Sequence, residues 1–518
     1  MGVYTRATQR VASQSSIGID IGTTGAKTLL INKQGTVLAS AGVEYPLSHP
    51  RPGWAEQDPE DWWRAVVDGI RKVLHDSGIR AGEVRGLGLS GQMHGTVFLD
   101  AKNEVLRPAI LWCDQRTAAE CDEITETIGP KDLIRHTCNP ALTGFSAPKI
   151  VWLRRHEPDV YAKVRKVLLP KDYIRFRLSG EFFGEVSDAS GTLLFDVANR
   201  RWSDHVLDKL EIPKAWLPEI FESPEPTTNI NATAAQATGL GEGTPIVGGS
   251  GDQAAGGVGN GIVREGVVSS TIGTSGVVFA SAASPKLDER GRVHTFCHAV
   301  PGTWHVMGVM LSAGGSFRWL RDTLGTEGYD ELTADAAKAP VGCEGLIFLP
   351  YLSGERTPHA DPFARGVFFG LGARHDKPAL ARAVMEGVTY GLRDSLEIIR
   401  GMGVEVQQIR ASGGGAKSAL WRQMQADVFG SPVVTTDKDE GPAFGVALLA
   451  AVGTGAYASV EEACDATIRV VSEVEPNPAN SAVYNEYYPI YRQLYLDLKA
   501  RFEQTARTVE KGINSSHV

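Results

Sequence analysis

One five-residue pattern occurs twice in this chain, about half the chain length apart. Ile21-Gly22-Thr23-Thr24-Gly25 returns as Ile272-Gly273-Thr274-Ser275-Gly276. Each copy lies between two runs rich in strand-forming residues, which predicts a strand, a tight Gly/Thr turn and a second strand. A match of five residues can arise by chance, but the matched context favours an internal duplication. Two copies of one domain would place two Gly/Thr loops around a shared cleft.

The rest of the chain alternates predicted strands with predicted helices, which is typical of an α/β protein. A length of 518 residues is enough for roughly two to four domains. A Gly- and Pro-containing segment at 240–245 indicates a linker between two large halves. We therefore expect a disordered tail at 1–15, a first domain at 16–244, a second domain at 245–480, and a C-terminal helix with a polar tail at 481–518.

Composition excludes several classes of protein. The formal net charge is -9, from 52 Lys and Arg against 61 Asp and Glu, whereas proteins that bind nucleic acid backbones are usually basic. No apolar run approaches the ~18 residues of a membrane-spanning helix. The six cysteines form no Cys-x-x-Cys pair, so we expect free thiols and a cytoplasmic protein.

The repeated Gly/Thr turn has the chemistry of a phosphate-binding loop. Glycines let backbone N–H groups converge on an anion, and threonine hydroxyls add donors. The turn is not a Walker loop, which needs a lysine and leads into a helix. Asp20, at the end of the first strand, would repel phosphate unless a divalent cation lay between them. The alternative is an ordinary hairpin turn, with Asp20 as a solvated strand end.

A second acid, Asp252, lies on the Gly-rich segment 250–257 after a predicted buried strand. A carboxylate held on such a turn beside a phosphate loop can act as a general base. The alternative is that Asp252 caps a helix beginning near Gln253. The different settings of Asp20 and Asp252 favour two roles, one beside a metal ion and one facing a substrate hydroxyl.

Two further loops are candidates for ligand contact. The segment 412–418 contains three consecutive glycines and opens a predicted helix, which offers a flat backbone surface to a nucleotide. Met93 and His94 follow a predicted strand end on a Gly-flanked loop. The alternative for His94 is a purely structural histidine.

Together these motifs resemble the FGGY family of sugar kinases, in the actin/hexokinase-like superfamily. The resemblance extends from about Ile17 to the last predicted helix. The segments that carry it are Gly18-Ile19-Asp20-Ile21-Gly22-Thr23-Thr24-Gly25, Trp54-Ala55-Glu56-Gln57-Asp58-Pro59, Gly91-Gln92-Met93-His94-Gly95, Leu169-Pro170-Lys171-Asp172-Tyr173, Gly251-Asp252-Gln253-Ala254-Ala255-Gly256 and Phe348-Leu349-Pro350-Tyr351-Leu352-Ser353-Gly354-Glu355-Arg356-Thr357-Pro358.

The resemblance implies a fold of two actin-like (ribonuclease H-like) domains, with mixed sheets flanked by helices, duplicated around a central cleft. It implies ATP-dependent phosphorylation of D-xylulose to D-xylulose 5-phosphate in pentose catabolism. Asp252 would be the catalytic base, and Asp20 would support Mg²⁺. The alternatives are the same reaction on ribulose, glycerol or gluconate, and a non-catalytic actin-like sugar sensor.

The family motifs also imply binding residues. The sugar would contact Gln92, Met93, His94 and Asp252. The partners implied are a small sugar and ATP, with no nucleic acid and no membrane, and the chain could form a homodimer. This chain departs from many relatives at Cys113 and Gln115, and from some at Gln253. Nucleotide contacts would fall on Thr23, Thr24, Gly273, Thr274, Gly314, Gly414 and Ser418.

Overall fold

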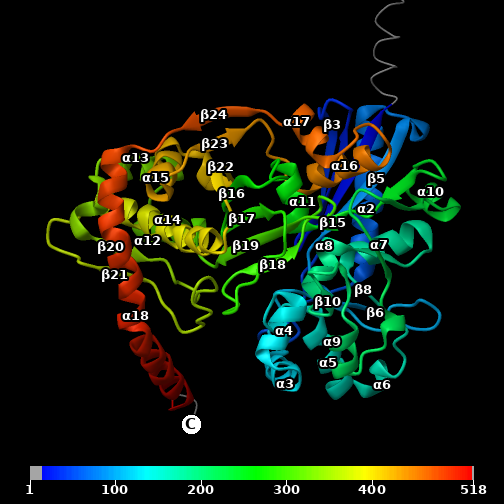
Figure 1. Ribbon diagram of the computed structural model, residues 1–518, viewed down its shortest axis with the longest axis horizontal. Coiled ribbons are helices and arrows are strands. Elements are labelled where there is room, and N and C mark those ends of the chain that lie inside the picture. The colour runs from blue at the N-terminus through cyan, green and yellow to red at the C-terminus, as the bar shows by residue number, and fades with distance from the viewer. Residues whose placement is uncertain (1–13, 516–518) are drawn as a thin grey trace, which may run out of the picture.

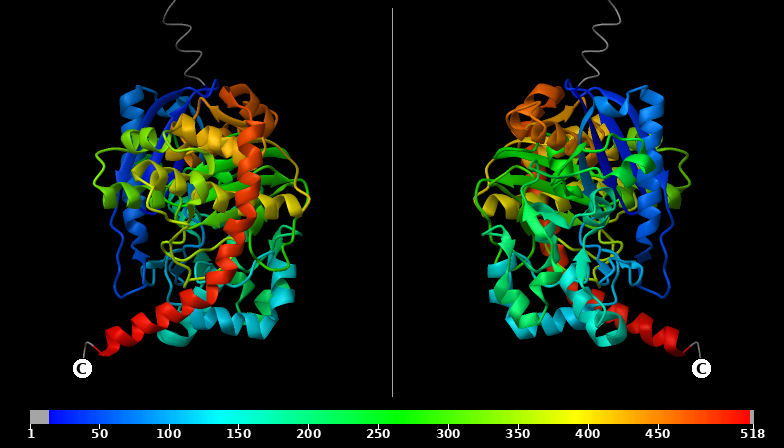
Figure 2. Two further views of the ribbon diagram at one scale, coloured as in Figure 1. Left: turned by 90° about the vertical axis from the view of Figure 1, so that its left-hand side faces the viewer. Right: turned by 90° about the vertical axis from the view of Figure 1, so that its right-hand side faces the viewer.

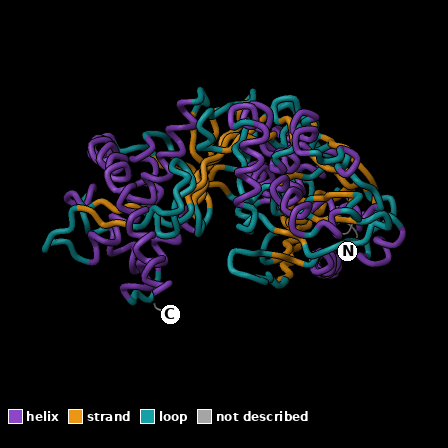
Figure 3. Tube along the Cα trace, turned by 90° about the horizontal axis from the view of Figure 1, so that it is seen from below, coloured by secondary structure: helices purple, strands orange, loops and turns teal. Residues whose placement is uncertain are grey.

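The computed structural model describes residues 14–515, which form two lobes side by side (Figure 1). Almost all of the tail expected at 1–15 lies outside the described residues. Each lobe is built on a mixed sheet of seven strands. Figure 3 shows helices gathered around the strands in both halves of the molecule. The predicted α/β architecture is therefore confirmed.

In the sheet of the first lobe, β5 is parallel to both β1 and β14, whereas β2 pairs antiparallel with β1. Apolar residues fill β1, whose side chains are almost all buried, as its β-branched sequence predicts. The strand order across the sheet is β13 (Pro226–Asn229), β14 (Pro245–Val247), β5 (Val84–Gly91), β1 (Ser15–Ile21), β2 (Gly25–Ile31) and β3 (Val37–Glu44).

The sheet of the second lobe repeats this order. Here β16 is antiparallel to β17 and parallel to β22, as β1 is to β2 and β5. The match extends from β3 and β19 on one side to β13 and β24 on the other, with β18 added beyond β19, so the predicted duplication is confirmed. The order is β18 (His294–Cys297), β19 (Trp304–Met310), β17 (Gly276–Ala282), β16 (Gly266–Ile272), β22 (Val406–Ser412), β23 (Val433–Thr436) and β24 (Val470–Val474).

The first sheet extends past residue 244, where the sequence suggests that the first domain ends. Strand β14 and the short β15 (Ser250–Gly251) both pair with β5 of the first sheet. The helix after them, α11 (Asp252–Gly259), packs against α16 (Pro442–Gly453), and α16 covers β1 and β5. Segments from the second half of the chain therefore complete the first lobe and join the two.

Two glycines allow α16 to approach the first sheet closely. A Cβ atom at Gly18 would lie 1.9 Å from the carbonyl oxygen of Ala443, and one at Gly88 would lie 2.1 Å from that of Val446. Any larger residue at either position would therefore push α16 away from the sheet. On the other face, α2 (Pro59–Ser77) packs against β2 and β3.

Several long helices belong to the second lobe. They include α12 (Gly314–Leu324), α13 (Tyr329–Ala336), α14 (Lys377–Gly401) and α15 (Ala419–Phe429). The last helix, α18 (Pro478–Ser515), runs along the outside of this lobe and its final turns extend beyond it (Figure 2). It is longer at both ends than the predicted helix. No helix within residues 14–515 is both long and apolar enough to cross a membrane.

Candidate active site

Asp20 and Asp252 lie at the same edge of the first sheet. Strands β1, β5 and β15 are parallel, with Asp20 opposite Ser90 and Ser90 opposite Ser250. Neighbouring strands are about 4.8 Å apart, so only one strand separates Asp20 from the turn that carries Asp252. The fold thus brings together two carboxylates that are far apart in sequence.

The two carboxylates have different surroundings. The hydroxyl of Ser90 donates a hydrogen bond of 2.9 Å to Oδ1 of Asp20. Burial raises the pKa of Asp20, while Ser90 and the positive charge of Lys27 act in the opposite direction. Burial also raises the pKa of Asp252 to about 7, and the negative charge of Asp20 adds to this effect. Asp252 is therefore suited to accept a proton near neutral pH.

Asp252 is the first residue of α11 and not its cap, since Gly251 occupies the cap position. Hydrogen bonds from Gln253 act to lower the pKa of Asp252, so Gln253 also helps to hold this carboxylate. The helix-cap alternative for Asp252 is wrong.

A buried set of hydroxyls supports the turn before Asp252. The backbone N–H of Gly251 donates to Oγ of Ser187 at 3.1 Å, and that hydroxyl donates to Oε2 of Glu185 at 2.9 Å. Oγ of Ser250 lies 2.9 Å from Oγ of Ser187. Both Ser187 and Glu185 have no exposed surface. The position of the Asp252 turn is thus fixed by α8 (Val186–Ala189) and the residue before it.

The Met-His loop follows β5 directly. Met93 is buried and packs against Gly251, next to Asp252. His94 has a left-handed backbone, with φ of 70°, and its Nδ1 lies 2.6 Å from the carbonyl oxygen of Gly191. Burial lowers the pKa of His94 to about 3, so its ring is neutral. Because a carbonyl only accepts, Nδ1 carries the proton, and Nε2 is left as an acceptor.

Lys149, on α5 (Ser146–His156), holds this loop from behind. Its Nζ donates to the carbonyl oxygens of His94 at 2.8 Å and of Gly144 at 2.6 Å. Burial lowers the pKa of Lys149 to about 7. Lys149 was not singled out in the sequence, because nothing local to it indicates contact with a loop 55 residues earlier.

The side chain of Thr23 faces the Met-His loop. Its hydroxyl donates to Oε1 of Gln92 at 3.2 Å and accepts from Nε1 of Trp112 at 2.9 Å. Gln57 donates to the backbone oxygen of Thr23 at 2.7 Å and accepts from Gln92 at 3.0 Å. Gln57 and Trp112 are site residues that sequence reasoning missed, although Gln57 lies within one of the family motifs.

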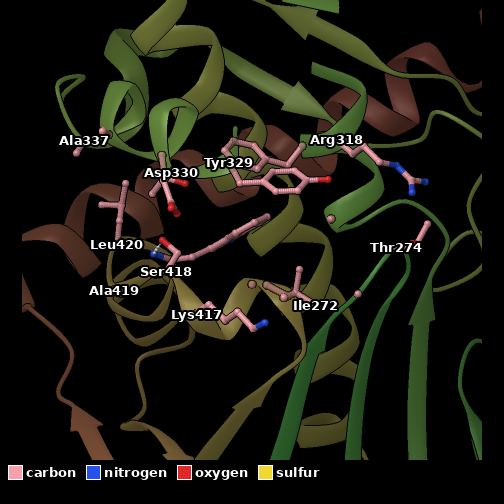
Figure 4. Close-up of a pocket in the computed structure, with 18 residues that line it drawn as sticks. Ile272, Thr274, Arg318, Tyr329, Asp330, Ala337, Lys417, Ser418, Ala419 and Leu420 are labelled. Atoms are coloured by element: carbon pink, nitrogen blue, oxygen red, sulfur yellow. Dashed lines mark hydrogen bonds between the residues drawn. The ribbon is translucent and has the colours of Figure 1, made fainter. Parts of the chain in front are cut away.

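A cavity of about 700 Å³ lies at the corresponding edge of the second sheet. Five of the seven predicted nucleotide-contact residues line it together. Thr23 and Thr24 do not, because they belong to the first lobe. Figure 4 shows Thr274 and Arg318 on one side of the cavity, with Asp330, Ser418 and Leu420 on the other. The five predicted residues are Gly273, Thr274, Gly314, Gly414 and Ser418.

Glycines let three backbone segments meet at this cavity. The N–H of Gly314 donates to the carbonyl oxygen of Gly273 at 2.8 Å, and a Cβ at Gly314 would lie 2.4 Å from that oxygen. Gly413 has a φ of 74°, and a Cβ there would lie 2.6 Å from the carbonyl oxygen of Ile272. The start of α12 and the loop after β22 are thus held against the Gly/Thr turn.

The cavity also contains residues that the sequence did not single out. Arg318 follows Gly314 by four residues on α12, and this i, i+4 spacing on one helix face is a signal that could have found it. Tyr329 and Asp330 begin α13 and carry no comparable signal. Trp421 is buried, lines the cavity and donates to the hydroxyl of Thr389 at 3.1 Å.

The edge of the first sheet that carries Asp20 and Asp252 fits a metal ion that is bound to the phosphates of a nucleotide. Among residues 14–515, no three His, Cys, Asp or Glu side chains gather as a self-contained metal site. Mg²⁺ commonly takes one or two carboxylates and completes its shell with phosphate and water oxygens. Asp20, partly buried and with one hydroxyl donor, supplies such a carboxylate.

Comparisons with known proteins agree with this arrangement. Residues 15–259 match the N-terminal domain model, and residues 268–454 the C-terminal domain model, of the FGGY family of carbohydrate kinases. A xylulose kinase of Escherichia coli is 43% identical over 483 residues, which cover 93% of this chain and 99% of the relative. A crystal structure from Brucella ovis, described as a xyloylose kinase, superposes with a TM-score of 0.89 at 38% identity, covering 94% of this chain and all of the other. A gluconate kinase from Lactobacillus acidophilus gives a TM-score of 0.90 at 29% identity, with 95% and 99% covered.

Proposed function

The chain belongs to the FGGY family of carbohydrate kinases, and on this premise we propose that it phosphorylates D-xylulose with ATP. The product is D-xylulose 5-phosphate, an intermediate of pentose catabolism. The observation that carries this substrate is the identity with relatives named xylulose kinase, which extends over nearly the whole chain. The Gln92-Met93-His94 loop, typical of that branch of the family, supports the same substrate.

Asp252 is proposed as the general base. Its carboxylate takes the proton from the terminal hydroxyl of the sugar, and the hydroxyl oxygen forms a bond to the γ-phosphorus of ATP. The bond between that phosphorus and the β–γ bridging oxygen breaks, and ADP leaves. The pKa of Asp252, raised to about 7, supports this role. Because the transition state of phosphoryl transfer is loose, positioning contributes more than the strength of the base.

The sugar is proposed to lie against the Met-His loop. Because Nδ1 of His94 donates to the carbonyl oxygen of Gly191, Nε2 is the ring nitrogen that can accept a hydrogen bond from a sugar hydroxyl. Gln92 is held in place by Gln57 and Thr23, and Met93 forms an apolar contact beside Asp252.

The nucleotide is proposed to occupy the 700 Å³ cavity. The backbone and hydroxyl of Thr274, with Gly273, Gly314, Gly414 and Ser418, would contact it there. Thr23 and Thr24 would offer backbone N–H groups to the phosphates from the opposite lobe. Asp20 would hold Mg²⁺, which when bound neutralises part of the negative charge on the transferring phosphoryl group.

A substrate panel tests the proposal. ADP release is measured with D-xylulose, D-ribulose, glycerol and gluconate, each with and without ATP. We expect the highest kcat/KM for D-xylulose. A higher value for gluconate, the substrate named for the Lactobacillus acidophilus relative, would show that the sugar assignment is wrong. If no sugar in the panel gave ADP release, the result would favour a non-catalytic sensor.

Location and oligomeric state are also proposed. We propose a cytoplasmic location, which agrees with the absence of disulfides among the six cysteines. We also propose a homodimer, which light scattering of the purified chain tests directly.

A further inference from the structure

A second hollow, of about 450 Å³, lies outside the active site between α18 and the loop at 353–361. Three arginines line it, and none of its lining residues in the described part of the chain is acidic. It shares no lining residue with the nucleotide cavity. Its lining includes Arg290, Arg292, Arg492, His359, Pro358 and Leu496.

The arginines are only partly neutralised. Arg292 forms a two-pronged bond with Asp288, with one N–O distance of 2.7 Å. Nε of Arg492 lies 3.5 Å from Oδ1 of Asp394, and the Arg492 side chain is 64% exposed. Arg290 is exposed and forms no ion pair with any of residues 14–515. Positive charge is therefore available to an incoming ligand.

The surroundings of His359 agree with a positive hollow. Burial lowers the pKa of His359 to about 4, with Asp361 opposing this effect and the charges of Lys499 and Arg492 adding to it. Its ring stacks on Tyr495, with centroids 3.4 Å apart. A neutral, stacked histidine offers a polar edge without adding a charge.

The walls of the hollow are fixed by hydrogen bonds. The hydroxyl of Thr357 donates to the backbone oxygen of Arg292 at 2.9 Å and accepts from the N–H of Val309 at 3.0 Å. The hydroxyl of Tyr495 donates to Asp361 at 2.9 Å. A site that is already ordered loses less entropy when a ligand binds.

We propose that this hollow binds a small phosphorylated organic molecule, a function beyond the proposed kinase activity. Guanidinium groups bind phosphate oxygens through paired hydrogen bonds, and three of them suit a dianion better than a single carboxylate. Pro358 and Leu496 provide an apolar wall for the organic part. The volume exceeds what a bare phosphate ion fills.

Calorimetry on the full chain tests this site, with ADP and D-xylulose present in excess to occupy the active site. Ribose 5-phosphate is the probe, and ribose is its uncharged counterpart. We expect saturable binding of ribose 5-phosphate and none of ribose. The double variant Arg290→Gln/Arg492→Gln should bind at least tenfold more weakly. The control Arg64→Gln/Arg135→Gln removes two other exposed arginines, on the first lobe, and should bind as the wild type does.

Three results would overturn the proposal. These are no binding of ribose 5-phosphate to the wild type, an unchanged affinity in the double variant, or an equal loss in the control variant. If inorganic phosphate bound as tightly as ribose 5-phosphate, the proposal that the hollow also binds the organic part of the ligand would be wrong. Should the double variant not fold, Arg290→Gln alone, which breaks no ion pair, should still weaken binding severalfold. An unchanged affinity in that variant would also overturn the site.

Discussion

The indole Nε1 of Trp112 donates a hydrogen bond of 2.9 Å to the hydroxyl oxygen of Thr23. That hydroxyl in turn donates to Gln92, so the first Gly/Thr turn is joined by side chains to the Met-His loop. The backbone of the turn and the exposed side chain of Thr24 are left to face a phosphate group. The turn therefore has two faces, one for each proposed substrate.

Thr23→Val separates these two faces. The substitution keeps the shape and the backbone N–H but removes hydrogen bonds worth about 0.5–1.5 kcal/mol each. We expect KM for the sugar to rise roughly tenfold, while KM for ATP changes much less. Steady-state kinetics with each substrate varied in turn measures both. A larger effect on ATP would show that the hydroxyl, and not only the backbone, serves the nucleotide.

Thr274→Val tests the equivalent turn in the second lobe. Thr274 lines the nucleotide cavity, and loss of a charge-assisted hydrogen bond to phosphate costs about 1.5–3 kcal/mol. We expect kcat/KM for ATP to fall roughly tenfold or more. Thr435→Val is the control, because its hydroxyl bonds to Ser472 away from the cavity. Equal kinetics in the two variants would refute the assignment of this turn.

Lys149→Met tests the support behind the Met-His loop. The change removes a donor from the carbonyl oxygens of His94 and Gly144. That of His94 still accepts from Thr96 and Ser146, so the main loss is at Gly144, at a cost of about 1–3 kcal/mol. We expect a raised KM for the sugar, a KM for ATP close to the wild-type value and a lower melting temperature. Lys166→Met, which removes a lysine bonded to the carbonyl of Ala215, is the control. An unchanged sugar KM in Lys149→Met would contradict a positioning role.

The raised pKa of Asp252 predicts a pH-dependent stability. An aspartate in an unfolded chain ionises near pH 3.9, whereas Asp252 in the fold keeps its proton up to about pH 7. Between these values the folded state binds more protons, so the contribution of Asp252 to stability falls as pH rises. Asp252→Asn should therefore raise the melting temperature more at pH 8 than at pH 5, in metal-free buffer.

A matched control for that measurement is Asp58→Asn, because Asp58 caps α2 and asparagine caps a helix equally well. It should change the melting temperature little at either pH. A gain for Asp252→Asn that is equal at both pH values would show that the carboxylate is not held in its protonated form.

Much of the fold follows from local patterns in the sequence. The repeated Gly/Thr turn predicts the duplicated sheets. Asp58 and Pro59, the end of one of the family motifs, are the cap and the first residue of α2. These features are determined by residues that are close together in the sequence, so the sequence predicts them.

The errors arise where distant residues decide the structure. Strand β14 looks like the start of a new domain, yet it pairs with β5, more than 150 residues earlier. The last helix begins at Pro478, before the expected start at 481, and its final turns extend beyond the lobe (Figure 2). The glycines of the nucleotide cavity were predictable from their clustering, whereas Trp112, Lys149 and Arg318 depend on contacts across the fold.

The central claim is that Asp252 is the general base and Asp20 the metal-supporting acid. The measurement is kcat of Asp252→Asn and of Asp20→Asn, each over a range of Mg²⁺ concentrations. Removal of a general base typically lowers the rate by about 10²–10⁴, so kcat of Asp252→Asn should fall by that factor at every Mg²⁺ concentration. Asp20→Asn should recover part of its activity as Mg²⁺ rises. If Asp252→Asn kept more than roughly a tenth of the wild-type kcat, or if only its defect responded to Mg²⁺, the two roles would be wrongly assigned.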